Sequence, residues 1–177
     1  MNIQDTNYIP EVLQELENLM KYTVQVGVLQ GVSEDKYPDI DVLTLARIHE
    51  YGIDIEVTEK MRAYLHYQGL HLNPDTTHIK IPERSFLRSG FDNRVKQVED
   101  KLEWLVDEVI NLNITAYDMY NALGAELTGL IQQYLTDLSD PRNHPFTIQQ
   151  KGSSNPLITA SGGGRLRQAI TWQVVTR

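Results

Sequence analysis

Hydrophobic and polar residues follow two different spacings along the first part of the chain, and these spacings predict its elements. Residues 10–20 carry apolar side chains at helical intervals and predict a short amphipathic helix. Residues 22–29 alternate apolar and polar side chains, which is typical of a half-buried strand. After a polar loop at 30–40, Asp41 is placed to cap a second helix, which ends at Gly52.

Shorter patterns follow this second helix. Residues 53–57 predict a short strand, and Thr58 can cap a helix that reaches Tyr67. Residues 77–81, with the sequence THIKI, predict another strand. Pro82 ends that strand and is suited to the first turn of a helix.

Two long apolar stripes then predict a pair of helices. The first predicts one helix of about thirty residues and about 45 Å in length, with a kink at Gly90. Its stripe consists of Leu87, Phe91, Val95, Val98, Leu102, Leu105 and Val109. The second helix begins near Asn113 or Thr115 and buries Met119, Leu123, Leu127, Leu130, Tyr134 and Leu138. The short polar link between the stripes indicates an antiparallel pair.

The composition changes to Pro, Gly, Ser and Asn between residues 139 and 164. This predicts a long loop that is mobile in the free subunit and becomes ordered when it binds a neighbour. The alternative is a loop that Ile158 and Leu166 already hold against the sheet of its own chain. Residues 169–176 alternate and predict a last strand.

Composition and charge narrow the class of protein. The 177 residues contain no cysteine, which excludes disulfides, thiolate catalysis and Cys-ligated metal sites. The net charge of −8 argues against a general nucleic-acid binder. The N-terminus has no secretory-signal pattern, and no apolar run approaches the roughly 20 residues that span a bilayer, so we expect no membrane association.

The charges are unevenly distributed along the chain. Residues 1–57 carry a net charge of −8, 58–101 carry +2, 102–140 carry −7 and 141–177 carry +5. One interpretation is ordinary scatter of surface charge. The other is complementarity, in which the basic C-terminal region meets an acidic surface of a neighbouring copy or partner.

No constellation of residues predicts an enzyme, a metal site or a cofactor. His49-Glu50 resembles the start of a zinc-protease helix, but the second histidine is missing, because position 53 is Ile53. Surface or interface positions are expected for His66, His71 and His78, which lack metal-ligand spacing. The glycine run before Arg165 lacks the features of a phosphate-binding loop, although its amides could bind an anion beside Arg165 and Arg167. A flexible turn is the alternative.

Four segments, taken in order, resemble one family. They are VQVGVLQG at 24–31, LARIHEYG at 45–52, IPERSFLR at 81–88, and KGSSNPLITASGGGRLRQAITWQVV at 151–175. Their order and spacing are similar to those of the neck or tail-completion (head–tail joining) proteins of tailed bacteriophages. Residues 57–80 correspond to an insertion, or arm, that short members of the family lack.

The resemblance implies a non-enzymatic structural protein of the virion. Such a protein joins the head, on its portal or connector side, to the tail as a subunit of a ring, expected to be a hexamer. Its partners would be other copies of itself, connector or stopper proteins, and tail-terminator or tail-tube proteins, with DNA passing through the ring. Its location would be the head–tail junction of the virion, and the host cytoplasm during assembly.

Two alternatives remain open. One is a tail terminator that caps the tail tube, and the other is an anion- or nucleic-acid-binding module that uses the basic C-terminal region. The fold expected in each case is a single α+β domain over residues 1–177. It would have a small, mainly antiparallel sheet packed against a long helix pair, with an inserted arm at 57–80 and a long C-terminal loop at 139–164.

Seven residues are candidates for the interface with partners. Arg84 and Arg88 would share one helical face, where their like charges repel unless an acidic surface of a neighbour faces them; two solvated arginines are the alternative. Phe86 would be an interface anchor or a core residue. The remaining candidates are Phe146, Leu157, Arg165 and Arg167.

Overall fold

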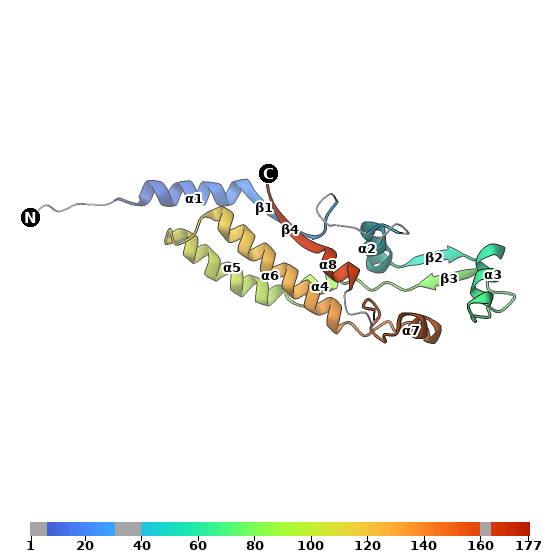
Figure 1. Cartoon of the computed structure of the whole chain (residues 1–177). Helices are drawn as coiled ribbons and strands as arrows, with labels where there is room; N and C mark the ends of the chain where they lie inside the picture. The colour runs from blue at the N-terminus through green and yellow to red at the C-terminus, as the bar shows by residue number, and fades with distance from the viewer. Residues whose placement is uncertain (1–6, 31–39, 160–163) are drawn as a thin grey trace, which may run out of the picture.

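The computed structural model describes residues 7–30, 40–159 and 164–177. The molecule is elongated, with a helix at one end, a helix pair in the middle and a narrow arm at the other end (Figure 1). Its elements are α1 (Ile9–Lys21), β1 (Tyr22–Val28), α2 (Val42–Tyr51), β2 (Ile53–Glu56), α3 (Glu59–Tyr67), β3 (His78–Ile81), α4 (Arg88–Asp92), α5 (Val95–Ile110), α6 (Ala116–Asp137), α7 (Pro145–Lys151), α8 (Arg165–Ala169) and β4 (Ile170–Thr176). The strands form two antiparallel pairs, β1 with β4 and β2 with β3. The predicted α+β class is confirmed, with two small sheets where one was expected.

The β1–β4 ribbon lies along α6 and joins strands from opposite ends of the chain (Figure 1). The two strands pair in register over the seven residues of each. The closest approach to α6 is at Gly124, where a Cβ would lie 2.4 Å from Trp172 Cδ1 and 2.9 Å from Val24 Cγ2. The missing side chain therefore allows the ribbon to pack directly on the helix backbone.

The prediction of a single helix of about thirty residues is wrong. Pro82 begins no helix, and the next helical residue is Arg88, at the start of α4. Asn93 and Arg94 then separate α4 from α5. The Asn93 side-chain amide donates a hydrogen bond of 2.7 Å to the carbonyl oxygen of Ser89. The Ser89 carbonyl also accepts from the Asn93 backbone amide at 3.0 Å, so the Asn93 side chain folds back on the last turn of α4 at its C-terminal end.

Gly90 lies inside α4 and is not the point where the helix breaks. A Cβ on Gly90 would lie 3.4 Å from Tyr134 Cδ1 and 3.6 Å from Ile131 Cγ1, two side chains of α6. The small size of Gly90 therefore serves the close packing of α4 on α6.

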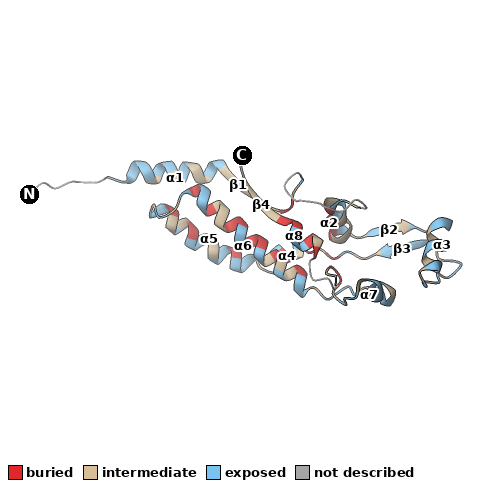
Figure 2. Ribbon diagram, in the orientation of Figure 1, coloured by how far each residue is buried: buried red, intermediate tan, exposed pale blue. Residues whose placement is uncertain are grey.

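The apolar stripe of the first predicted helix is only partly buried (Figure 2). Its residues Val98, Leu105 and Val109 form a core cluster with Met119, Leu123 and Leu127 of α6. Phe91, Val95 and Leu102 are exposed, because α6 and α1 pack on only one side of α5. Truncation of Leu102, which is 36 % exposed, should therefore cost less than the 2–5 kcal/mol typical of a fully buried leucine.

The second predicted helix and the antiparallel pairing are confirmed by α6 and α5 (Figure 1). Thr115 begins α6 with a capping box, in which its side chain accepts from the Asp118 amide while the Asp118 carboxylate accepts from the Thr115 amide. Of the six residues expected on the buried side, Leu130, Tyr134 and Leu138 are half-buried.

The described part of the predicted loop at 139–164 contains one short helix that composition did not predict, and the mobility of this loop in the free subunit stays a prediction. Residues Pro145–Lys151 form α7, and the chain after it is hydrogen-bonded to the rest of the subunit. The Asn155 amide donates to the carbonyl oxygens of Thr136 and Leu138, and Leu157 is buried in the core. Residues 160–163 of the predicted loop, and 31–39 of the loop at 30–40, lie outside the described residues.

The arm is larger than the predicted 57–80 segment. Strands β2 and β3 pair from Ile53 opposite Ile81 to Glu56 opposite His78, and α3 lies at the end of this ribbon (Figure 1). A second core cluster lies where the arm joins the body, between α2, α6, α8 and the residues around Phe86. The segments that resemble the phage family meet at this place.

Candidate functional site

Glu50, the last buried residue of α2, holds the segment that follows the arm. It is 3 % exposed, and its carboxylate accepts from Ser85 Oγ at 2.8 Å and from the backbone amides of Leu87 and Arg88 at 2.9 and 3.1 Å. Arg88 Nε also donates to Glu50 at 3.0 Å. Glu50 thereby satisfies the free amides at the start of α4 and binds the second resembling segment to the third.

The backbone after Glu50 passes directly beside the same segment. Gly52 has a φ of +72°, and a Cβ there would lie 2.8 Å from both the Glu83 nitrogen and the Ile81 oxygen. The Arg84 amide donates to the carbonyl oxygen of His49 at 2.7 Å. Glycine at 52 is therefore required both by the positive φ and by the close approach of two segments of the same chain.

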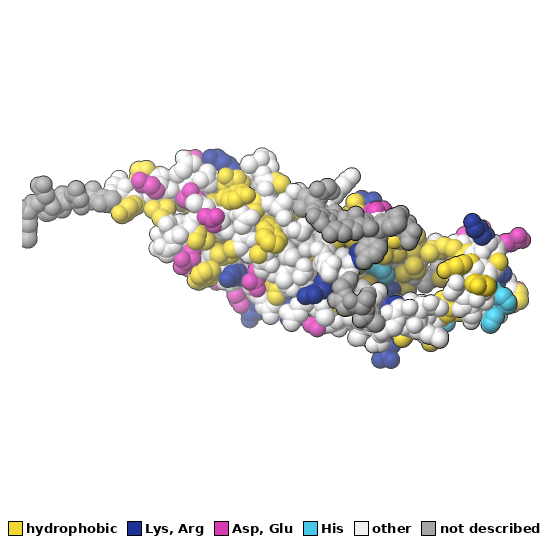
Figure 3. Space-filling view, in the orientation of Figure 1, with side chains coloured by type: hydrophobic (Ala, Val, Ile, Leu, Met, Phe, Trp, Pro, Cys, Tyr) yellow, Lys and Arg dark blue, Asp and Glu magenta, His cyan; other side chains and the backbone are white. Residues whose placement is uncertain are grey.

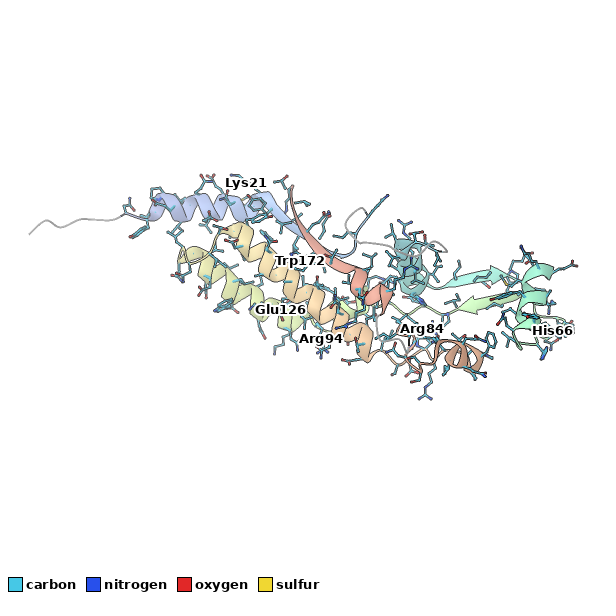
Figure 4. All side chains as sticks on the ribbon, in the orientation of Figure 1. Lys21, His66, Arg84, Arg94, Glu126 and Trp172 are labelled. Carbon is cyan, nitrogen blue, oxygen red and sulfur yellow. The ribbon has the colours of Figure 1, made fainter. Side chains whose placement is uncertain are left out.

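Arg84 continues the connection toward the C-terminal part of the chain (Figure 4). It is 4 % exposed and donates to the Pro141 carbonyl at 2.8 Å and to Asn143 Oδ1 at 3.0 Å. Lys151 Nζ in turn donates to the carbonyl oxygens of Asn155 and Pro156 at 2.8 and 2.9 Å. We call this connected set, at residues 49–52, 82–88, 141–143 and 151–157, the motif junction.

The motif junction corrects the prediction made for the two arginines. Arg84 and Arg88 do not lie on one helical face, because residues 82–87 are not helical. The charge of Arg88 is balanced within its own subunit by Glu50 and by Glu83, at 2.8 Å. The hydrogen bond to Glu50 accordingly raises the pKa of Arg88. Arg88 therefore needs no acidic surface on a neighbour to balance its charge, whereas the described side-chain partners of Arg84 are uncharged oxygens of its own subunit.

A cleft of about 520 Å³ opens beside the junction, between α2, α7 and α8. His49, Asn143, Lys151 and Arg165 contribute polar groups to it, and the described lining contains no Asp or Glu. Burial, together with the charge of Arg84, lowers the pKa of Lys151. The described part of the lining therefore carries basic side chains and no acidic one.

His49 is neutral in this cleft. Burial, reinforced by the positive charges of Arg84 and Lys151, lowers its pKa to about 4, and its Nδ1 has no hydrogen-bond partner among the described residues. A catalytic histidine needs a group that orients it and a nucleophile within reach, and no described contact supplies either. His49 is therefore a packing residue of the junction in this structure.

The buried neutral state of His49 predicts that stability falls in mild acid. Below pH 6.5 the unfolded chain binds a proton at His49, whereas the folded chain does so only near pH 4. The contribution is complete above pH 6.5 and is lost toward pH 4, with a slope of at most about 1.4 kcal/mol per pH unit. The unfolding free energy, measured by urea unfolding at several pH values between 5 and 7, should depend less steeply on pH for His49→Gln than for the parent chain. Parallel profiles would contradict the assignment.

The other predicted interface residues differ in their surroundings. Phe86 and Leu157 are buried in the subunit's own core, which agrees with the core alternative for Phe86. Arg165 is half-buried and donates to the Ile40 carbonyl, and Phe146 on α7 is half-buried. Arg167 on α8 is exposed. Of these five residues, only Arg167 is exposed.

Sequence reasoning missed the structural roles of Glu50, Asn143 and Lys151. The sequence pattern places Glu50 only in an incomplete metal-binding motif, which predicts no role for its side chain. A signal was present, because Glu50 falls on the same helical face as the apolar Val42 and Ala46, and a glutamate on such a face is rarely buried unless it is paired. The roles of Asn143 and Lys151 depend on a loop conformation that composition does not encode.

Neither a metal-binding cluster, nor a membrane-spanning helix, nor a similar known protein points to a function. Within the described ranges, no group of three or more His, Cys, Asp or Glu residues could hold a metal ion, and no helix is long and apolar enough to cross a membrane. No protein-family model, no curated protein sequence and no solved structure matches this chain. Its function is therefore inferred from its own residues and contacts.

Proposed function

We propose that this chain is a non-enzymatic structural subunit of a tailed-bacteriophage neck, which joins the portal side of the head to the tail. In this proposal, copies of the chain form a ring, with a hexamer as the expected number, and DNA passes through its centre. The ring binds a connector or stopper protein on one side and a tail-terminator or tail-tube protein on the other.

The observation that supports the proposal is the convergence of the four resembling segments. Glu50 of the second segment binds the third, and Arg84 of the third binds the loop that leads to the fourth. The first and fourth segments pair as β1 and β4. The resemblance therefore covers residues that jointly hold one subunit together, which is the pattern expected of a shared fold rather than of scattered chance matches.

The shape and charge of the subunit fit a part of a ring. A ring requires two different surfaces on each copy that complement one another. Acidic side chains gather over α1 and α5 at one end of the molecule (Figure 3), whereas α7 and α8 contribute Lys151, Arg165 and Arg167 in the basic C-terminal region. These two regions are the surfaces that we propose meet between neighbouring copies.

Electron microscopy of the particles that contain this protein tests the proposal. An antibody against the chain should label the junction between head and tail, and particles made without the chain should separate into filled heads and finished tails. A tail terminator would instead stop growth of the tail tube, so its loss would give tails of irregular length. Antibody label elsewhere on the particle, or particles without any label, would overturn both the neck proposal and the tail-terminator alternative.

Charge reversal at Arg167 tests the proposed contact between copies. Because Arg167 is exposed, Arg167→Glu should leave the unfolding free energy within about 0.5 kcal/mol of the parent value. It should nevertheless reduce incorporation into particles at physiological salt. Lys60→Glu, an exposed change on α3 at the end of the arm and outside both proposed surfaces, is the matched control and should be incorporated normally. Normal incorporation of Arg167→Glu would contradict the electrostatic contact.

The same purified protein tests the alternative of a nucleic-acid-binding module. Phosphate contacts release counterions, so genuine DNA binding weakens steeply as salt increases. Two of the five basic residues in 141–177, Lys151 and Arg165, already donate to carbonyl groups of their own chain. We therefore expect weak binding with a salt slope near zero, and a steep slope would favour the alternative.

A further inference from the structure

The end of the arm brings two histidines together that are separate in the sequence pattern. His66 lies in the last turn of α3, and the chain then reverses at Gly69, which has a φ of +91°. The Gly69 amide donates to the His66 carbonyl and the Leu70 amide to the Leu65 carbonyl, at 3.0 and 2.8 Å. This tight reversal returns His71 to the side of His66.

The two imidazoles present the same nitrogen to each other. His66 Nδ1 and His71 Nδ1 are 2.7 Å apart, and the ring centroids are 4.4 Å apart. At this distance at most one of the two nitrogens carries a proton, so at least one lone pair points into the space between the rings. When neither nitrogen is protonated, both lone pairs point there.

The spacing is close to that of two ligands on one metal ion. Histidine nitrogens lie about 2.0 Å from a bound transition metal, so two of them are about 2.8 Å apart at a 90° angle and about 3.3 Å apart at a tetrahedral angle. The observed 2.7 Å is nearer the first value. Right-angled ligand positions are typical of Cu²⁺ and Ni²⁺, whereas Zn²⁺ prefers tetrahedral positions.

We propose that His66 and His71 form a two-nitrogen binding site for a divalent transition metal, with Cu²⁺ favoured over Ni²⁺ and Zn²⁺. Nitrogen ligands bind Cu²⁺ more tightly than either of the other ions. Both histidines are exposed, and Figure 4 shows His66 at the end of the arm, so the remaining coordination positions are open to water or to a donor from another molecule. The described residues supply no third His, Asp or Glu ligand.

The local structure holds the pair ready for the metal. Arg62 of α3 donates to the carbonyl oxygens of Asn73, Pro74 and Thr76, which fastens the loop that carries His71 beneath the helix. A pair held in place loses less conformational entropy on binding than two freely moving side chains. His66 also lies at the C-terminal end of α3, where the helix dipole favours a positive charge.

Calorimetric titration of the full, untagged chain with CuCl₂, NiCl₂ and ZnCl₂ tests the site. The Cu²⁺ affinity should fall at least about tenfold in His66→Ala and in His71→Ala, because each change removes one of the two protein ligands. The double variant, which keeps neither ligand, should lose at least as much Cu²⁺ affinity as the weaker-binding single variant. His78→Ala, which removes another exposed histidine of the arm, is the matched control and should bind Cu²⁺ as the parent does.

Nuclear magnetic resonance of the imidazole nitrogens provides a readout at the level of single atoms. Addition of diamagnetic Zn²⁺ should shift the Nδ1 signals of His66 and His71 and leave those of His78 unchanged. Two results would overturn the proposal: undiminished Cu²⁺ affinity in the double variant, or an equal loss in His78→Ala. Binding of one metal per two chains supports the site and identifies a second copy as the source of the remaining ligands.

Discussion

Replacement of Glu50 by alanine is expected to lower the free energy of unfolding by about 3–5 kcal/mol. The change removes a buried carboxylate and leaves Ser85 Oγ, two backbone amides and Arg88 Nε without their acceptor. For a chain of this size the loss corresponds to a fall of roughly 6–20 °C in Tm. Urea unfolding followed by circular dichroism, together with a thermal scan, measures it.

Glu83→Gln is the matched control for Glu50→Ala. Glu83 also contacts Arg88, at 2.8 Å, but its side chain is 54 % exposed. An exposed ion pair contributes at most about 1 kcal/mol, so this variant should remain close to the parent. Comparable losses in the two variants would show that the carboxylate charge near Arg88 matters and that the buried contacts of Glu50 do not.

Replacement of Phe86 by alanine is expected to cost about 3–5 kcal/mol. Its side chain is fully buried in the cluster formed by α2, α6, α8 and Leu157, so truncation leaves a cavity that the surrounding helices can only partly fill. The same unfolding measurements apply. If Phe86 were instead an anchor for a neighbouring subunit, the isolated subunit would keep its stability and only assembly would suffer.

Phe91→Ala separates these two outcomes. Phe91 lies five residues further along the chain and is 42 % exposed. Its truncation therefore leaves no enclosed cavity and should lower the unfolding free energy much less than truncation of Phe86. Equal stability of the Phe86→Ala and parent chains would contradict the burial described here. A large loss at Phe91 would mean that its surface is covered in solution.

Elements whose signals are local could be predicted from the sequence. The helix at 10–20, the strand at 22–29 and the caps at Asp41, Thr58 and Thr115 all appear in the structure. Each cap depends on a hydrogen bond to an amide three residues away. Such short-range geometry is encoded by residue type and spacing alone.

Features that depend on distant contacts could not be predicted in this way. The break between α4 and α5 at residues 93–94 was missed because the apolar stripe of the predicted single helix continues across it. The site formed by His66 and His71 was missed because a five-residue spacing matches no helical or strand face and arises only from the reversal at Gly69. Both depend on how the backbone turns, which hydrophobic spacing does not report.

The motif junction shows the division most clearly. The sequence by itself determined the helix, the cap and the glycine around Glu50. Only the tertiary structure decided that Glu50 binds Ser85, 35 residues later, and that Arg84 binds Pro141, 57 residues later. The physical reason is that a charged side chain is buried only where the folded chain supplies its partners, and those partners come from parts of the sequence with no local relation to it.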